Sequence, residues 1–521
     1  MADIVVCNER FVLPGGRVGL FRIRRAETNN IEKAVLRTGF GLYHKFLIGL
    51  TALSYFSEAI ILTTLMYVIP LMACDIPLSE NMIISVNVVY SIGEALGGFA
   101  FCAMSDIFGR KYLIPILSAL IFASTLACSF VHGSMFLFIF LMCLGSGLSA
   151  NTSIMKIHLA EILPMYRRGM YLVFVNMFWT CGYFISTAMA WGFSPLAARY
   201  YNKDARFFTW RVMCALSSIF SILIGCASNL IKPSIRFLLY SKRHKEALNT
   251  LKEVYAINNS KNSEDFKLNE ITLHNQIHDY GIFKNIPIRV YFEHMCALIK
   301  TAHSATVLLI SKKFVVRFMI MIYMKMVTCS GIIMAAMWMY KLLQMPDNCY
   351  IHNTDILYSE IPADPQNCTL KLEGDAYRDT LLLGINVLVG QFIAVVFVDT
   401  VCRKYLIVLA CTVCGMSNFI FAFIRSFNLN SLNLGLVSAY LIFFSVLNTI
   451  IDVVIVEIFP TAIRGTAIGE TQFFLHLTLM FIKKYFGMNC KVSLLLAGTF
   501  TEIAAVLALF LPEFKGRPMM E

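Results

Sequence analysis

Four charged side chains lie inside long apolar stretches, where an unpaired charge is costly. Glu58, Lys325, Asp452 and Glu470 each interrupt such a run. An ionised side chain at the centre of a bilayer costs about 2.5–3.5 kcal/mol on insertion scales, so it usually faces a partner or a water-filled space. We therefore expect these four to line a polar solute cavity. A Glu58–Lys325 ion pair across it is one hypothesis; the alternative is that each side chain reaches the interface or another partner.

Aromatic and weaker polar candidates occur in the same kind of segment. Trp179 and Trp191 share one apolar stretch and are candidates for an aromatic wall against an apolar or cationic ligand. The alternative for Trp191 is a place in the aromatic belt at the membrane interface. Glu94 is a weaker site candidate, and His476 is a lone polar residue that neighbouring helices would satisfy.

Residue patterns for covalent or metal chemistry are missing from the sequence. It shows no paired carboxylates for acid–base work, no nucleophile–base set and no histidine–cysteine cluster at zinc spacing. Cys411 and Cys414 form a CxxC, but inside an apolar run, where small core residues are expected. We therefore expect neither an enzyme nor a bound metal or cofactor.

Composition places these candidates in a polytopic membrane protein. The hydrophobic set makes up 58% of 521 residues, only 15% are charged, and the mean hydropathy is +0.68. A soluble domain has about 25% charged residues, so a soluble enzyme, a disordered scaffold and a nucleic-acid-binding module are excluded. A span needs about 20 apolar residues in a helix. Twelve stretches qualify, near 45–70, 81–104, 112–130, 134–160, 169–192, 209–231, 314–338, 380–398, 405–424, 434–456, 465–486 and 490–511.

Loop charges predict the orientation and the domains. The segment 232–313 carries thirteen Lys/Arg and seven Asp/Glu, whereas 339–379 carries three and seven. By the positive-inside rule the basic side is cytosolic, which puts both termini in the cytosol. The expected parts are therefore a cytosolic tail, a six-helix bundle, a cytosolic linker, a second six-helix bundle and a short cytosolic tail, covering 1–44, 45–231, 232–313, 314–511 and 512–521.

Two loops carry further features. Asn367 begins a glycosylation sequon in the acidic loop 339–379, which we expect to be exoplasmic. Cys349 and Cys368 share this loop; they form a disulfide or remain free. In the basic linker, apolar residues from Ala247 to Tyr255 recur at helical spacing, and either an amphipathic helix or a solvated connector fits them.

Two charged motifs occur twice, about 295 residues apart. Asp-x-x-Gly-Arg-Lys-Tyr-Leu-Ile begins at Asp106, and a copy with cysteine for glycine begins at Asp399. Glu-Ile-x-Pro followed by Arg-Gly begins at Glu161 and again at Glu457. The chain therefore reads as a duplicated six-span unit, an all-α membrane protein with twelve transmembrane helices in two halves. The charged and glycine positions in these repeats are Asp106, Gly109, Arg110, Lys111, Glu161, Arg168, Asp399, Arg403, Lys404, Glu457 and Arg464.

This pattern resembles the major facilitator superfamily. The resemblance implies that the Asp106 and Asp399 loops hold the halves together on the cytosolic side, and that the repeated Glu and Arg residues form the matching gating network. The alternative is that these charges only anchor loops and set the topology. Many proton-coupled members carry an arginine in the fourth span, four residues before a Gly-x-Gly. Leu141 occupies that position here, so that coupling scheme is in doubt; Lys156 is a substitute at a different depth.

Finer motifs are most similar to the synaptic vesicle glycoprotein 2 family and to related sugar-porter and organic-ion transporters. They include Trp210-Arg211-Val212, the eroded Lys232-Pro-Ser-Ile-Arg236, Met177-Phe178-Trp179, Asp452 with Glu457, and Leu511-Pro-Glu-Phe-Lys-Gly516. The resemblance also implies that Glu58 and Asp452 match acidic positions of that family.

Two functions follow as hypotheses. The first is a secondary transporter that moves a small organic solute by alternating access, as a monomer in the lipid bilayer and without a nucleic-acid partner. The second is a vesicle-membrane protein with a transporter fold that acts with partners in trafficking or secretion. The expected location is the plasma membrane or a secretory or synaptic-type vesicle.

Overall fold

The described part of the chain is built from helices. A computed structural model describes residues 30–76, 80–199, 203–266, 295–334, 374–423, 430–486 and 490–513, and every regular element in these ranges is helical. The first bundle contains α3 Leu42–Asp75, α4 Glu80–Phe108, α5 Arg110–Ser129, α6 Ser134–Ile162, α7 Arg168–Arg199 and α8 Lys203–Ser228. The second contains α12 Val315–Met334, α14 Gly374–Phe397, α15 Arg403–Phe423, α16 Asn430–Ile458, α17 Arg464–Phe486 and α18 Cys490–Leu509.

Eleven of these described helices are long and apolar enough to cross a membrane. The remaining one, α17, has 23 residues and packs against α4 and α12 within the bundle. Its own polar residues, which include Glu470 and His476, lower its hydropathy without moving it out of the bundle. Together with α17, the eleven make the twelve spans that the sequence predicts. The prediction of an all-α membrane protein is confirmed.

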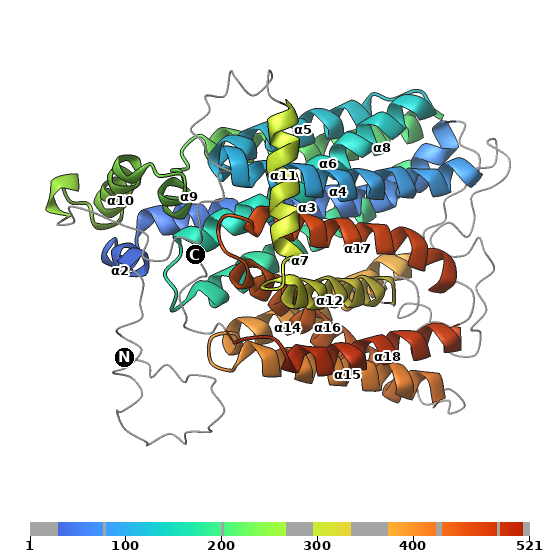
Figure 1. The fold of residues 1–521 in the computed structure, drawn as a ribbon. Coiled ribbons are helices and arrows are strands. Elements are labelled where there is room, and N and C mark those ends of the chain that lie inside the picture. Colours follow the sequence, from blue (N-terminus) through green and yellow to red (C-terminus); the bar gives the residue numbers. More distant parts are fainter. Residues whose placement is uncertain are drawn as a thin grey trace.

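The two halves repeat one packing plan, which agrees with a duplicated unit. The main helix pairs of the first half have equivalents in the second: α3·α7 with α12·α17, α4·α6 with α14·α16, α5·α8 with α15·α18, and α3·α8 with α12·α18. The halves meet along α4·α17 and along α7·α14, which are again equivalent pairs. Figure 1 shows the first half in blue to green above the second half in yellow to red.

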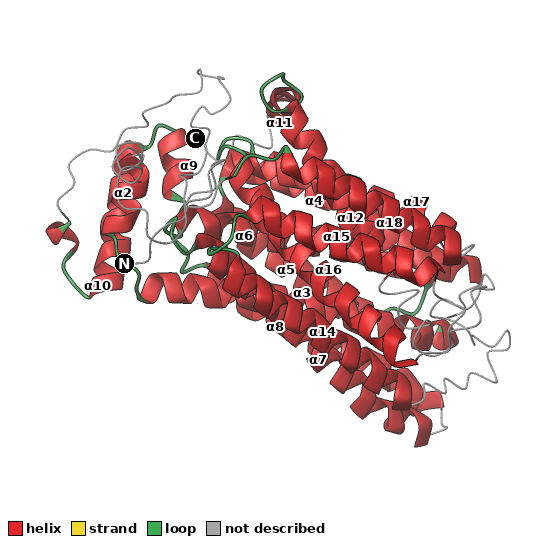
Figure 2. Ribbon diagram, turned by 90° about the horizontal axis from the view of Figure 1, so that it is seen from below, coloured by secondary structure: helices red, strands yellow, loops and turns green. Residues whose placement is uncertain are grey.

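Short helices gather at one end of the bundle, which we call the linker end (Figure 2). They are α2 Asn30–Arg37, α9 Ile235–Tyr240 and α10 His244–Asn259. Ala247, Leu251 and Val254 of α10 are buried at a spacing of three to four residues, as expected for one face of an amphipathic helix. Ala247 and Leu251 pack with apolar residues of α2 and α9 in a small separate core, whereas Val254 belongs to the main core. Of the two alternatives for this part of the linker, α10 matches the amphipathic helix.

A further linker helix, α11 Met295–Leu309, lies across the bundle instead of along it (Figure 1). It packs on both α4 and α17, and therefore covers the line where the two halves meet. Thr306 Oγ1 of α11 donates a hydrogen bond to Glu470 Oε1 of α17 at 2.5 Å.

Candidate functional site

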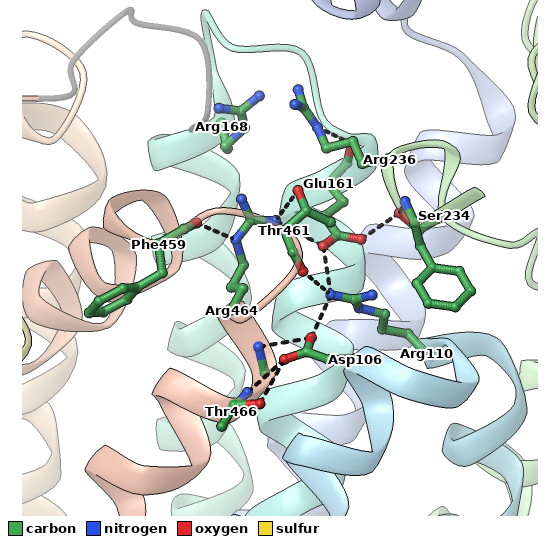
Figure 3. Close-up of polar contacts among 12 residues, drawn as sticks. Asp106, Arg110, Glu161, Arg168, Ser234, Arg236, Phe459, Thr461, Arg464 and Thr466 are labelled. Atoms are coloured by element: carbon green, nitrogen blue, oxygen red, sulfur yellow. Dashed lines mark hydrogen bonds and ion pairs between the residues drawn. The ribbon is translucent and has the colours of Figure 1, made fainter. Parts of the chain in front are cut away.

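At the linker end, a buried carboxylate from one half binds the start of a helix in the other. Asp106, at the end of α4, accepts hydrogen bonds from Gly465 N at 3.0 Å, Thr466 N at 2.8 Å and Thr466 Oγ1 at 3.1 Å (Figure 3). These donors lie in the first turn of α17, where backbone N–H groups have no partner within the helix. The contact joins the halves, and it consists of a few directional bonds.

Glu161 continues this connection between two arginines. Its Oε1 lies 3.1 Å from Arg110 NH2 and 2.8 Å from Arg464 NH1, and Ser234 Oγ donates to its other oxygen. Arg110 also binds Asp106 at 2.9 Å. The side chains of Arg110, Glu161 and Arg464 are fully enclosed. Together with Asp106, the two arginines and the two carboxylates balance one another without help from water.

The second copy of the motif makes the equivalent contact in the opposite direction. Asp399, just after α14, accepts a hydrogen bond from Met170 N in the first turn of α7 at 2.9 Å. Arg403 lies 3.3 Å from Asp399 and is also paired with Glu457. Each half therefore places its motif aspartate at the start of a helix in the other half. We call the two aspartates, with Arg110, Arg403, Glu161, Glu457 and Arg464, the linker-end lock.

Glycines make room for the lock at both aspartates. A Cβ on Gly465 would lie 2.4 Å from Cys102 O and 2.8 Å from Asp106 Oδ1. A Cβ on Gly169 would lie 2.4 Å from Asp399 Oδ1. Separations below 3.0 Å are essentially never found for a real Cβ, so both aspartates depend on a missing side chain. Gly109, between α4 and α5, has φ +89°, a backbone conformation that favours glycine.

The repeat is broken at Arg168, the counterpart of Arg464. Arg168 NH2 donates to Glu32 Oε1 of α2 at 2.9 Å, and Arg236 of α9 donates to the same oxygen at 2.5 Å. All three side chains are no more than 2% exposed. Burial alone would raise the pKa of Glu32, but Arg236 and Arg168 outweigh it and hold that pKa below its usual value. The N-terminal segment is thereby tied to the lock.

Lys111 and Lys404 lie beside the lock and contribute less to it. Lys111 is half-buried. Lys404 Nζ lies over the Tyr405 ring at 5.2 Å, and its backbone N donates to Glu513 Oε2 at 3.3 Å. The repeat charges that bind across the halves therefore include Asp106, Asp399, and Glu161 with Arg464.

A second polar centre lies deeper in the bundle and again joins the halves. Asp452 of α16 is bound by Lys325 of α12 through Oδ1, and by Lys156 of α6 through Oδ2 at 2.6 Å. The side chains of Lys325, Lys156 and Asp452 are 5%, 11% and 17% exposed. Lys156 Nζ also lies over the Tyr55 ring at 5.3 Å. We call these three charged residues the central triad.

The predicted Glu58–Lys325 pair is wrong, because Lys325 is paired with Asp452. Glu58 of α3 lies instead beside Glu94, Lys156 and Thr152. Asp452 precedes the lock residue Glu457 by five residues on α16, and this spacing does not indicate a lysine partner from each half. Lys156, expected at a different depth from the usual arginine, lies at the depth of Asp452.

The remaining candidates do not converge on one wall. Trp179 is partly buried and stacks on Tyr183, with ring centroids 6.3 Å apart. Trp191 is 49% exposed and lies three turns further along α7, away from Trp179. Glu470 is buried against α11 and is separate from the triad. Asn367, Cys349 and Cys368 lie outside the described residues.

The far end of the bundle is also bridged. Tyr67 of α3 packs against Tyr377 of α14, with ring centroids 5.7 Å apart. Tyr183 OH donates to Thr380 O at 3.1 Å, and Thr180, nearer the middle of the spans, donates to Gln391 at 2.8 Å. Within the described ranges, no three His, Cys, Asp or Glu residues are placed to hold a metal ion. The polar chemistry seen between the halves is therefore ion pairing and hydrogen bonding.

Comparison with known proteins agrees with this architecture. The family model of the Major Facilitator Superfamily matches residues 51–482. Synaptic vesicle glycoprotein 2A of Homo sapiens is 28% identical over 253 residues, and synaptic vesicle glycoprotein 2B of Mus musculus is 26% identical over 254. Each match covers 47% of this chain, but only 34% and 37% of the relative's length.

Solved structures show the same fold. The proton:xylose symporter XylE bound to 6-bromo-6-deoxy-D-glucose superposes with a TM-score of 0.66 at 16% identity, over 92% of this chain and 98% of that one. The inward-open XylE from E. coli gives 0.53. The matched family model covers most of the chain and includes both copies of the repeated motifs. The protein therefore belongs to the major facilitator superfamily.

Proposed function

We propose that the protein is a secondary transporter that moves a small organic solute across the bilayer by alternating access, and not an enzyme. The observation that carries the proposal is the linker-end lock, in which Asp106 and Asp399 each bind the first turn of a helix from the opposite half. Such contacts connect two rigid bundles through a few directional bonds, which is the kind of interface that can open and close as a unit.

The central triad supplies the second requirement, a polar centre that both halves share. Asp452 and Lys325 come from the second half and Lys156 from the first. Because the triad is covered and both ends are bridged, a solute reaches it only after the halves separate at one end. When the halves separate, Lys156 of the first half moves away from Asp452 of the second half and their ion pair breaks. A polar solute can then replace the lost contact.

The orientation follows as part of the same proposal. The linker end carries the basic segments, which favours the cytosolic side for this end and for both termini. The protein then acts as a monomer, with the acidic loop containing Asn367 on the opposite side.

Uptake into proteoliposomes tests the proposal. Purified protein is screened with radiolabelled sugars, organic cations and organic anions, with Asp452→Asn as the defective variant. Glu253→Gln is the matched control, because Glu253 lies on α10 in an exposed ion pair with Lys232. Saturable flux that is lost in Asp452→Asn and kept in the control supports transport. No flux for any class, from protein that is monodisperse and thermally stable, argues against it.

A second function is favoured by the relatives. The similarity to synaptic vesicle glycoproteins 2A and 2B covers half of this chain, which supports a vesicle-membrane role in trafficking or secretion with little transport. Normal vesicle targeting by the folded protein, together with absent flux, supports this alternative. Flux that depends on Asp452 supports the first proposal.

A further inference from the structure

A separate polar contact joins the halves along the line where α4 meets α17. His476 Nδ1 of α17 lies 3.0 Å from Glu94 Oε2 of α4, and the two side chains are only 10% and 13% exposed. Glu94 lies twelve residues before Asp106, and His476 lies twelve residues after Arg464. At 1.5 Å per residue both are about 18 Å from the lock. The pair therefore lies near the middle of the spans.

Glu58 brings a second carboxylate to the same place. From α3 it interacts electrostatically with Glu94, Lys156 and Asp452, and it bonds with Thr152 of α6. The backbones of α4 and α6 come together here, since a Cβ on Gly145 would lie 2.5 Å from Tyr90 O and 3.1 Å from Glu94 N. Because α3 also packs on α6, both glutamates lie beside α6, and two neighbouring carboxylates with little access to water resist being ionised together.

Counting the connected charges gives an excess of one carboxylate. Glu58, Glu94 and Asp452 are the acids, whereas Lys156 and Lys325 are the only lysines that the described contacts connect to them. Leu141 is buried and apolar where an arginine would have balanced the count. An unbalanced charge away from water is costly. One added proton, carried by Glu58 or Glu94, makes the group neutral.

The other ionisable groups around this site do not remove the excess. Tyr90 faces Glu94 and Glu58, Tyr55 faces Asp452 and Glu58, and both hydroxyls are neutral acids. Glu470 lies nearer the start of α17 than His476 does, and it accepts a hydrogen bond from Thr306 of α11. His476 Nδ1 makes no aligned hydrogen bond in the described part of the chain, although it is buried and points at Glu94. An unbonded ring nitrogen beside a carboxyl group can accept a hydrogen bond from that group when it is protonated.

We propose that Glu58, Glu94 and His476 form a buried site that binds one proton shared between the halves. Because Glu94 belongs to the first half and His476 to the second, moving α4 away from α17 separates the imidazole from the carboxylates. Occupancy of the site is then linked to the arrangement of the halves. A role for this proton in driving solute movement rests on the proposed transport function, whereas proton binding itself does not.

Infrared titration of the full-length protein in lipid nanodiscs tests the site, with pH as the only ligand. A protonated carboxyl has a C=O stretching band that a carboxylate lacks, and the band shifts in D2O. We expect a band that titrates in wild type and disappears in both Glu58→Gln and Glu94→Gln, since removal of either acid balances the two lysines. His476→Asn is expected to move the midpoint of the titration. Glu253→Gln should leave the band unchanged.

Three results overturn the proposal: no titrating band in wild type, a band that only one of the two glutamine variants removes, or a midpoint that His476→Asn leaves in place. Glu94→Asp keeps the carboxyl and must retain the band, which separates loss of the site from misfolding, and melting curves check each variant. Glu470 and Glu502 contribute equally to all spectra and cancel in the differences. A band that behaves as expected in protein that transports nothing retains the proton site and rejects transport.

Discussion

Replacing Gly465 by alanine adds one methyl group at the most crowded point of the linker-end lock. The new Cβ would lie 2.4 Å from Cys102 O, 2.6 Å from Ser105 Oγ and 2.8 Å from Asp106 Oδ1. The nearest of these is backbone, which cannot rotate away. We therefore expect α17 to move from the end of α4 and the Asp106 contact to break, while each half stays folded.

The expected cost is set by two effects. Forcing a methyl group into a packed interface costs about 1–3 kcal/mol. A hydrogen bond to a charged group contributes about 1.5–3 kcal/mol, and Asp106 accepts three from Gly465 and Thr466. With relaxation recovering part of this, a net loss of about 3 kcal/mol for the closed arrangement is a reasonable central value. Since each 1.4 kcal/mol is tenfold, the closed-to-open ratio falls about 100-fold.

Cys102 is a native reporter of this change. Its side chain is fully buried next to Gly465 and Gly469 in the closed arrangement. Purified protein in nanodiscs is treated with a water-soluble maleimide, and labelling of the Cys102 peptide is followed by mass spectrometry. Gly465→Ala should increase the labelling rate by one to two orders of magnitude, in proportion to the open population.

Gly435→Ala is the matched control, because nothing lies within 4 Å of the Cβ it would add to α16. It should leave Cys102 labelling unchanged and raise stability slightly, by about 0.5–1 kcal/mol. The reasoning is refuted if Gly465→Ala melts like wild type and keeps Cys102 as protected as the control does.

Three further predictions use the same lock and the central triad. Gly169→Ala places a Cβ 2.4 Å from Asp399 Oδ1 and should open the second copy of the lock, seen as faster hydrogen exchange at the start of α7. Glu32→Gln should cost about 3–5 kcal/mol at pH 7, because it leaves Arg168 and Arg236 buried without their carboxylate. The pKa of Glu32 is below its usual 4.5, so this stabilisation is fully present well above pH 4.5 and is lost as the pH falls through the lower folded-state value. The difference in melting temperature between Glu32→Gln and wild type should therefore be largest at pH 7 and shrink as the pH is lowered below 4.5. Asp452→Asn should destabilise the protein by about 3–5 kcal/mol by leaving two buried lysines, and adding Lys325→Met should restore part of the loss in the same assay. An additive double variant would show that the Lys325–Asp452 pair is not coupled.

The spans and the duplication could be predicted from the sequence because both are local properties. An apolar run of about 20 residues forms a helix in lipid whatever its neighbours are, since the backbone has no other hydrogen-bond partner there. The repeated Asp106 and Asp399 motifs, and the Glu161 and Glu457 motifs, are matched in the structure by equivalent contacts. Apart from Arg168, the duplicated residues meet duplicated partners, so a repeated sequence pattern predicts which elements face each other.

Partners of single charges could not be predicted in this way. Lys325 pairs with Asp452 and not with Glu58, Lys156 reaches the same carboxylate from the other half, and Arg168 is bound by Glu32. Each pair depends on the rotation and depth of helices that lie 127 to 296 residues apart in sequence. Spacing along one chain specifies which face of a helix a residue occupies, but only the packing of the two bundles decides which charge it meets.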